Sequence, residues 1–155
     1  MSTELEELYN EARAAFDAMV ALNKAMRQRE FVKHEAHSSP CRFVYMFGSI
    51  HFDIGRGTGK TEWILSRVKP GDLIVTVNRD IQKTMRRELM RDGLGESVHV
   101  ISIHDLHHRG FHGLKFNVAY IDEPAAMMEK TGMTKYELVS RLVSGYDQTL
   151  IFTGA

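Results

Sequence analysis

The feature that most constrains this chain is a glycine-rich segment that ends in Lys-Thr. Its members are Gly55, Arg56, Gly57, Thr58, Gly59, Lys60 and Thr61. Residues 49–54 before it alternate between apolar and polar as a strand does, and residues 61–68 can begin a helix. A glycine-rich turn between a strand and a helix is typical of a phosphate-binding loop, because its backbone N–H groups and the helix N-terminus attract an anion.

The last two residues of this segment have defined roles in such a loop. Lys60 is expected to reach the β- and γ-phosphates of a nucleotide, and the Thr61 hydroxyl is expected to bind Mg²⁺. The general pattern, G-x-x-x-x-G-K-[ST], also requires glycine at position 54, where this chain has Ile54. The segment is therefore a variant of the loop, and its interpretation depends on the rest of the chain.

Segments that resemble strands and helices alternate through the remainder of the chain. Short runs rich in apolar and β-branched residues, typical of buried strands, occupy 73–77, 98–102, 117–121 and 149–153. Helical patterns lie between them, one at 79–91 and one that begins after Thr134. This order predicts an α/β domain with a mostly parallel sheet flanked by helices.

A long helix is predicted to precede this domain. Residues 3 to about 34 form it, so that residues 1–40 are the helix and its connector and residues 41–155 are the α/β domain. Apolar residues recur along the helix at spacings of three and four: Leu5, Leu8, Ala12, Ala15, Met19, Leu22 and Met26. Two interpretations stay open, an amphipathic helix packed on the domain and a helix that pairs with another chain.

The short run at 42–47 is aromatic and β-branched. It favours a strand or an aromatic platform beside adenine. The other interpretation is ordinary core packing of Phe43, Tyr45 and Phe47.

A second motif follows the apolar run 117–121, where Asp122 and Glu123 come directly after the last apolar residue. An Asp at the end of such a strand helps to hold Mg²⁺ in phosphate-loop enzymes. Glu123 is one residue further on, where it can polarise an attacking water. A second interpretation, compatible with the first, is that both residues cap a helix that starts at Pro124.

Together these motifs resemble an ATPase domain of the additional-strand class, a RecA-like P-loop fold. The matching segments are GRGTGKT, then NVAYIDEP, then LIFTGA. The likeness is greatest to the large terminase subunit of tailed phages, the ATPase that packages DNA, and it covers residues 48–155. This finer likeness depends on three features: Arg56 within the loop, the segment from Arg109-Gly110 to Glu123, and Thr153-Gly154.

The resemblance implies a Mg²⁺-dependent ATPase with ATP bound at residues 55–61. It implies that Thr61 and Asp122 hold Mg²⁺ and that Glu123 activates water. Arg56 corresponds to an arginine finger in cis, and the alternative for it is a solvated loop arginine.

The resemblance also implies the position of the last strand. Residues 149–153 would lie between strand 49–54 and strand 117–121, and Thr153 would sense the γ-phosphate and couple its loss to motion. The chain would then end at Ala155 near the nucleotide, so we expect either a domain of a longer protein or a stand-alone relative with reduced activity. Motor action would need an oligomer of this chain or other motor subunits.

Double-stranded DNA is the macromolecular partner that this resemblance implies, bound through phosphate contacts. The formal net charge of zero argues against a surface that is basic everywhere, so a local patch such as helix 79–91 is the candidate. No apolar run is long enough for a membrane span, the N-terminus is acidic, and Cys41 is the single cysteine. These features predict a cytoplasmic protein, in the host cytoplasm if it is viral.

Four histidines lie close together: His104, His107, His108 and His112. Pairs at a spacing of four could bind a metal on a helix, but this segment is expected to be a connection. A loop near DNA and a surface loop without a special role are the other interpretations.

Other functions share parts of this pattern. The first lobe of a superfamily-two helicase has the same three-part layout of motifs. A nucleotide-binding regulatory protein with little hydrolysis would fit the irregular loop. A nucleotide kinase fits less well, because Asp-Glu followed by Thr-Gly suits hydrolysis better.

Overall fold

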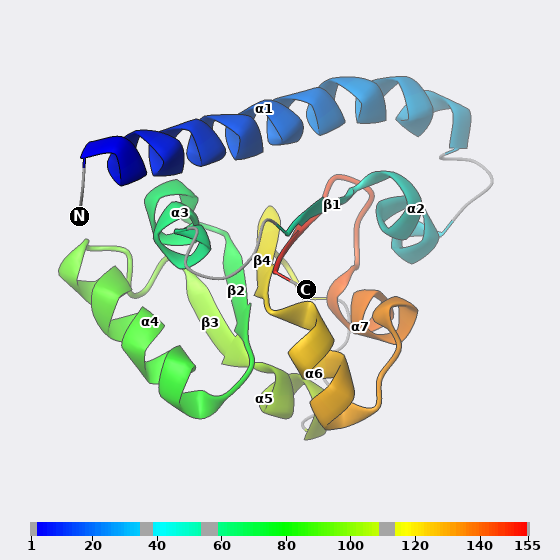
Figure 1. The fold of residues 1–155 in the computed structure, drawn as a ribbon. Helices are drawn as coiled ribbons and strands as arrows, with labels where there is room; N and C mark the ends of the chain where they lie inside the picture. Colours follow the sequence, from blue (N-terminus) through cyan, green and yellow to red (C-terminus); the bar gives the residue numbers. More distant parts are fainter. Residues whose placement is uncertain (1–2, 35–38, 54–58, 109–113, 155) are drawn as a thin grey trace.

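The computed structural model describes residues 3–34, 39–53, 59–108 and 114–154 (Figure 1). In these ranges the helices are α1 (Thr3–His34), α2 (Pro40–Phe47), α3 (Lys60–Arg67), α4 (Arg79–Arg91), α5 (Ile103–His108), α6 (Pro124–Thr131) and α7 (Lys135–Leu142). The strands are β1 (Ser49–Phe52), β2 (Leu73–Thr76), β3 (His99–Ser102), β4 (Val118–Asp122) and β5 (Thr149–Thr153). The predicted alternation of strands and helices is confirmed.

The five strands form one parallel sheet in the order β1-β5-β4-β2-β3. Strand β5 lies between β1 and β4, as the resemblance implied, so the last strand in the sequence is central in the sheet. All four residues of β2, Leu73–Thr76, are buried. Both faces of this strand are therefore covered, as is usual for a strand of a parallel sheet.

Helices cover both faces of the sheet. One core forms between the sheet and helices α1, α3 and α4, and the other forms between the sheet and helices α2, α5, α6 and α7. Neighbouring residues of β4 show the division, because Tyr120 belongs to the first core whereas Ala119 and Ile121 belong to the second. Side chains alternate across a strand, so an apolar run can serve both cores at once.

The segment 42–47 is a helix, so the strand expected there is wrong. Ser39 caps α2 by accepting a hydrogen bond from the Arg42 N–H at 3.2 Å, and Pro40 occupies the first turn. Proline is favoured there because its fixed φ suits the helix start and its missing N–H is not needed. Phe43 is completely buried in the core, which confirms the packing interpretation for that residue.

Helix α1 packs along the domain. Phe16 is buried, stacks on Phe52 of β1 with ring centroids 4.3 Å apart, and meets Trp63 of α3 edge-on at 5.5 Å. Arg27 is also buried, and its guanidinium donates hydrogen bonds to Thr149 Oγ1 at 2.7 Å and to the backbone carbonyls of Tyr146 and Gln148. These contacts fit the interpretation of α1 as a helix packed on the domain.

Among the helices of the described ranges, none combines the length and the apolar character that crossing a membrane requires.

Candidate active site

Three parallel strands bring the predicted site residues to one edge of the sheet. Asp122 at the end of β4 is in register with Thr153 at the end of β5, and Thr153 is in register with Phe52 at the end of β1. Helix α3, the next element along the chain after β1, begins at Lys60. Ligands of open α/β sheets bind outside the carboxyl ends of the strands, and this edge is therefore the candidate site.

The carboxylate of Asp122 is contacted from two sides. Thr153 donates a hydrogen bond from Oγ1 to Asp122 Oδ1 at 2.8 Å, and Thr61 donates from Oγ1 to Oδ2 at 3.4 Å. Thr153 is fully buried, so its hydroxyl is held by the surrounding packing. The side chain of Asp122 therefore has a defined orientation toward the start of α3.

Lys60 is the first residue of α3 and is only 7% exposed. Its Nζ lies 4.0 Å from Asp53 Oδ1. Gly59 before it has φ of 75°, a left-handed conformation that glycine adopts with little strain. The remaining residues of the predicted loop are outside the described residues: Gly55, Arg56, Gly57 and Thr58.

Glu123 has an unusual backbone. Its φ of 57° and ψ of 61° are left-handed, and among the described residues other than glycine it is the one with positive φ. Its N–H donates to the Thr153 carbonyl at 2.7 Å, which joins the ends of β4 and β5. Such a conformation costs on the order of 1–3 kcal/mol, and strained residues of this kind cluster at functional sites.

The Glu123 carboxyl group lies against Gly154. A Cβ atom on Gly154 would be 2.8 Å from that carboxyl group, and Gly154 itself has φ of 92°. Glu123 occupies the N-cap position of α6, but its side chain makes no capping hydrogen bond there. The side chain of Asp122 contacts Thr61 and Thr153, so capping does not account for this carboxylate either.

The donors at this edge fit Mg²⁺ and not a soft metal. The carboxylate of Asp122 and the hydroxyl of Thr61 are hard oxygen ligands, and the ion usually keeps several waters and binds through one or two protein groups plus phosphate. No group of three or more His, Cys, Asp or Glu side chains with metal-binding geometry exists in the described part of the chain.

Two residues that sequence reasoning missed lie beside the site. Asp53, directly after β1, is close to the Lys60 ammonium. Arg13 of α1 donates to Glu62 Oε2 at 3.0 Å, and its guanidinium would be 3.3 Å from a Cβ atom on Gly59. The sequence shows Arg13 as a polar residue within the helical pattern of α1, but nothing in the sequence identified Glu62 as its partner.

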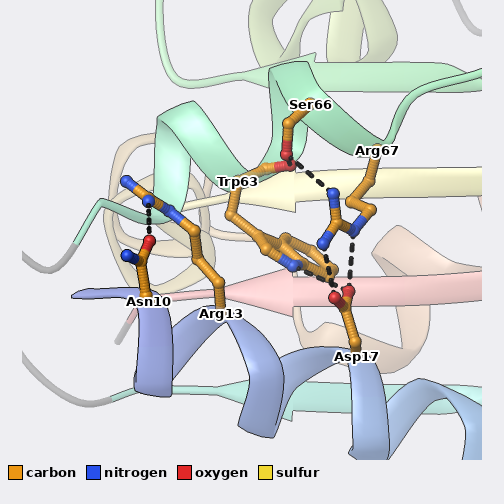
Figure 2. Close-up of polar contacts among 6 residues, drawn as sticks. All are labelled: Asn10, Arg13, Asp17, Trp63, Ser66 and Arg67. Atoms are coloured by element: carbon orange, nitrogen blue, oxygen red, sulfur yellow. Dashed lines mark hydrogen bonds and ion pairs between the residues drawn. The ribbon is translucent and has the colours of Figure 1, made fainter. Parts of the chain in front are cut away.

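Figure 2 shows how polar contacts hold α3 against α1. Asp17 of α1 accepts hydrogen bonds from Trp63 Nε1 at 3.1 Å and from Arg67 Nε at 2.7 Å. The hydrogen bond from Arg67 is the main reason that the pKa of Asp17 lies below its usual value. The position of α3, and therefore of Lys60, depends on α1.

The histidine segment lies in the connection between β3 and β4, as expected, but residues 103–108 form a helix and not a loop. His104, His107 and His108 belong to α5, and the rings of His104 and His108 have centroids 4.2 Å apart. His112 lies outside the described residues. The buried Nδ1 of His107 has no hydrogen-bond partner in the described structure.

Part of the basic side of α4 makes contacts within the chain. Arg86 donates to the Val100 carbonyl at 2.9 Å, and Arg79 lies 3.5 Å from Asp105. Arg91 pairs with Glu88 on the same helix. Lys83 and Arg87 are also exposed on this helix, and DNA binding there stays a prediction.

No protein-family model matches this chain, and a search of curated proteins found no significant match.

Proposed function

We propose that this protein binds ATP and hydrolyses it with Mg²⁺ at the carboxyl edge of its sheet, as a RecA-like P-loop ATPase. The observation that carries the proposal is the Asp122 carboxylate, which Thr61 of α3 and Thr153 of β5 contact together. These residues come from the three separate motifs, and Lys60, which precedes Thr61 in the chain, is buried.

Each residue has a role that follows from its chemistry. The ammonium of Lys60, at the N-terminus of α3, would stabilise negative charge on the phosphates. Thr61 and Asp122 would hold Mg²⁺, which supplies further positive charge to the phosphate oxygens when bound. Thr153 orients Asp122, and Glu123 would accept a proton from the attacking water.

The geometry around Glu123 supports a separate role for each carboxylate. Asp122 is held by two hydroxyl donors, whereas the left-handed backbone of Glu123 turns its side chain toward Gly154 at the end of β5. A fixed carboxylate suits metal binding, and a second one beside it suits water activation. Arg56 would add positive charge at the γ-phosphate in cis.

Packaging of double-stranded DNA is the finer form of this proposal, and it rests on the likeness of the three motifs to the terminase family. In that form the protein works in an oligomer or with other motor subunits. A superfamily-two helicase lobe and a regulatory nucleotide-binding protein are the alternatives.

Steady-state ATP hydrolysis and equilibrium ATP binding test the proposal. Glu123→Gln should reduce turnover by roughly 10²- to 10⁴-fold while ATP still binds, and Lys60→Ala should weaken binding. Lys69→Ala, at an exposed lysine before β2, is the matched control and should behave as the wild type.

The outcomes separate the alternatives. Stimulation of hydrolysis by double-stranded DNA, with a strong dependence on salt, favours the packaging motor. Binding of ATP without turnover favours the regulatory protein. If the wild-type protein does not bind ATP, the assignment of the phosphate site is wrong.

A further inference from the structure

Exposed apolar side chains are concentrated on α1. Of the nine large apolar residues that are exposed in the described chain, five belong to this helix. They are Leu5, Leu8, Met19, Leu22 and Met26. Leu22 is 63% exposed and Leu8 is 55% exposed, so water covers much of both side chains. A contiguous apolar surface of this kind usually marks an interaction site.

These five residues share one side of the helix. Successive residues of an α-helix turn by about 100°, which places all five within an arc of roughly 100° together with Ala12 and Ala15. We call these seven residues the outer seam. Phe16 and Arg27, which are buried against the domain, lie outside this arc, about 20° and 40° beyond Leu5. In Figure 1, α1 runs along the top of the molecule and the rest of the described fold lies below it.

We propose that the outer seam binds the outer seam of a second copy of this chain, with the two α1 helices antiparallel. From Leu8 to Met26 the spacing of the seam reads the same in both directions, so that one antiparallel register matches these six positions. The pairs that this register forms are Leu8 with Met26, Ala12 with Leu22, and Ala15 with Met19. The seam is about 32 Å long, and each small alanine faces a larger residue.

Charge decides between the two orientations. Glu4 and Glu11 flank the outer seam in the first half of α1, and Arg29 and Lys33 flank it in the second half; all four are exposed. A parallel pair would place Glu4 and Glu11 beside the same residues of the other copy. The antiparallel register instead places Glu4 about 1.5 Å along the axis from Arg29 of the second copy, within reach of both side chains.

The alanines allow a close approach at the middle of the pair. Ala15 lies about 3 Å along the helix from the two-fold axis, and Ala12 lies about one turn further from it. Two helices with alanines at the contact can pack toward the short end of the usual 8–10 Å separation. Each α/β domain would then lie on its own helix, and the pairing would use no residue of the Asp122 site. The inference therefore holds independently of ATP hydrolysis.

Sedimentation equilibrium tests the pairing. The wild-type chain should be a dimer at micromolar concentration, and Leu22→Glu should weaken dimerisation roughly 100-fold, because each dimer then buries two carboxylates without partners. Met90→Glu is the matched control, since Met90 is 71% exposed on α4, and it should leave the dimer intact. A wild-type monomer, or an unchanged dimer of the Leu22→Glu variant, overturns the proposal.

Cross-linking tests the orientation separately. Single and double cysteine variants are made in a Cys41→Ser background and treated with a short bismaleimide. Leu8→Cys with Met26→Cys in one chain should give a covalent dimer, whereas either substitution alone should give little. Efficient cross-linking of Leu8→Cys alone would mean a parallel pair and would overturn the antiparallel arrangement. Ala15→Cys with Met19→Cys in one chain should cross-link as the positive control for pairing.

Discussion

The hydroxyl of Thr153 provides a sharp test of how the candidate site is built. Thr153→Val keeps the shape of this fully buried side chain but removes the donor to Asp122 Oδ1. Hydrogen bonds to charged groups contribute about 1.5–3 kcal/mol. Asp122 is partly exposed and keeps its contact with Thr61, so we expect a loss near 1.5 kcal/mol. A loss of this size lowers the Tm of a domain this large by about 3–6 °C.

Mg²⁺ dependence is the second readout of the same substitution. In metal sites, removing a partner that orients a ligand weakens metal binding by about 10- to 100-fold. The Mg²⁺ concentration that gives half-maximal ATP turnover should therefore rise by a similar factor in Thr153→Val. Titration of hydrolysis with MgCl₂ at saturating ATP measures it.

Thr153→Ser separates the hydroxyl from the packing. Serine keeps the donor but loses a buried methyl group, which costs about 0.8 kcal/mol. The serine variant should thus lose some stability and keep a Mg²⁺ dependence close to that of the wild type. Equal Mg²⁺ dependence in the valine variant and the wild type, or equal impairment of the serine and valine variants, would refute the proposed role of this hydroxyl.

Three further substitutions probe other parts of the structure. Gly154→Ala should destabilise the fold by about 1–2 kcal/mol and lower turnover, because its φ is left-handed and the new Cβ would displace the Glu123 carboxyl group; unchanged kinetics would contradict this. Phe16→Ala should cost about 3 kcal/mol in urea unfolding, since the ring is buried against two aromatic residues; a loss below about 1 kcal/mol would mean that α1 is not part of the core. Burial, and then the charge of Lys135, lower the pKa of His51, so the unfolded chain binds more protons and stability should fall as the pH drops below about 6.5. His51→Gln should reduce that fall, as measured by unfolding at several pH values, and an identical pH profile would contradict the assignment.

Most of the secondary structure was predictable because its signals are local. The runs at 73–77 and 149–153 are apolar without interruption, which is what a strand covered on both faces requires, and both are strands of the parallel sheet. Asn78 and Thr134 were recognisable caps, and each side chain accepts a hydrogen bond from the first turn of its helix. The central position of β5 followed from the order of motifs and their likeness to a known class.

The segment 42–47 shows where local pattern fails. A short aromatic run fits a strand and a buried helix equally well, because a run of six residues is too short to distinguish the two periods. The better signal was Ser39 followed by Pro40, which together start a helix. The same limit applies to α5, whose histidines follow β3 without a loop.

Apart from α2 and α5, the sequence by itself indicated the order of strands and helices, the mostly parallel sheet and the residues of the three motifs, since these signals depend on neighbours in the chain. The tertiary structure decided which of those residues meet. It joined Asp122 to both Thr61 and Thr153, and it placed Asp17 of α1 against Arg67 of α3. Such contacts depend on packing between elements far apart in sequence. A local sequence pattern contains no information on how close those elements lie in space.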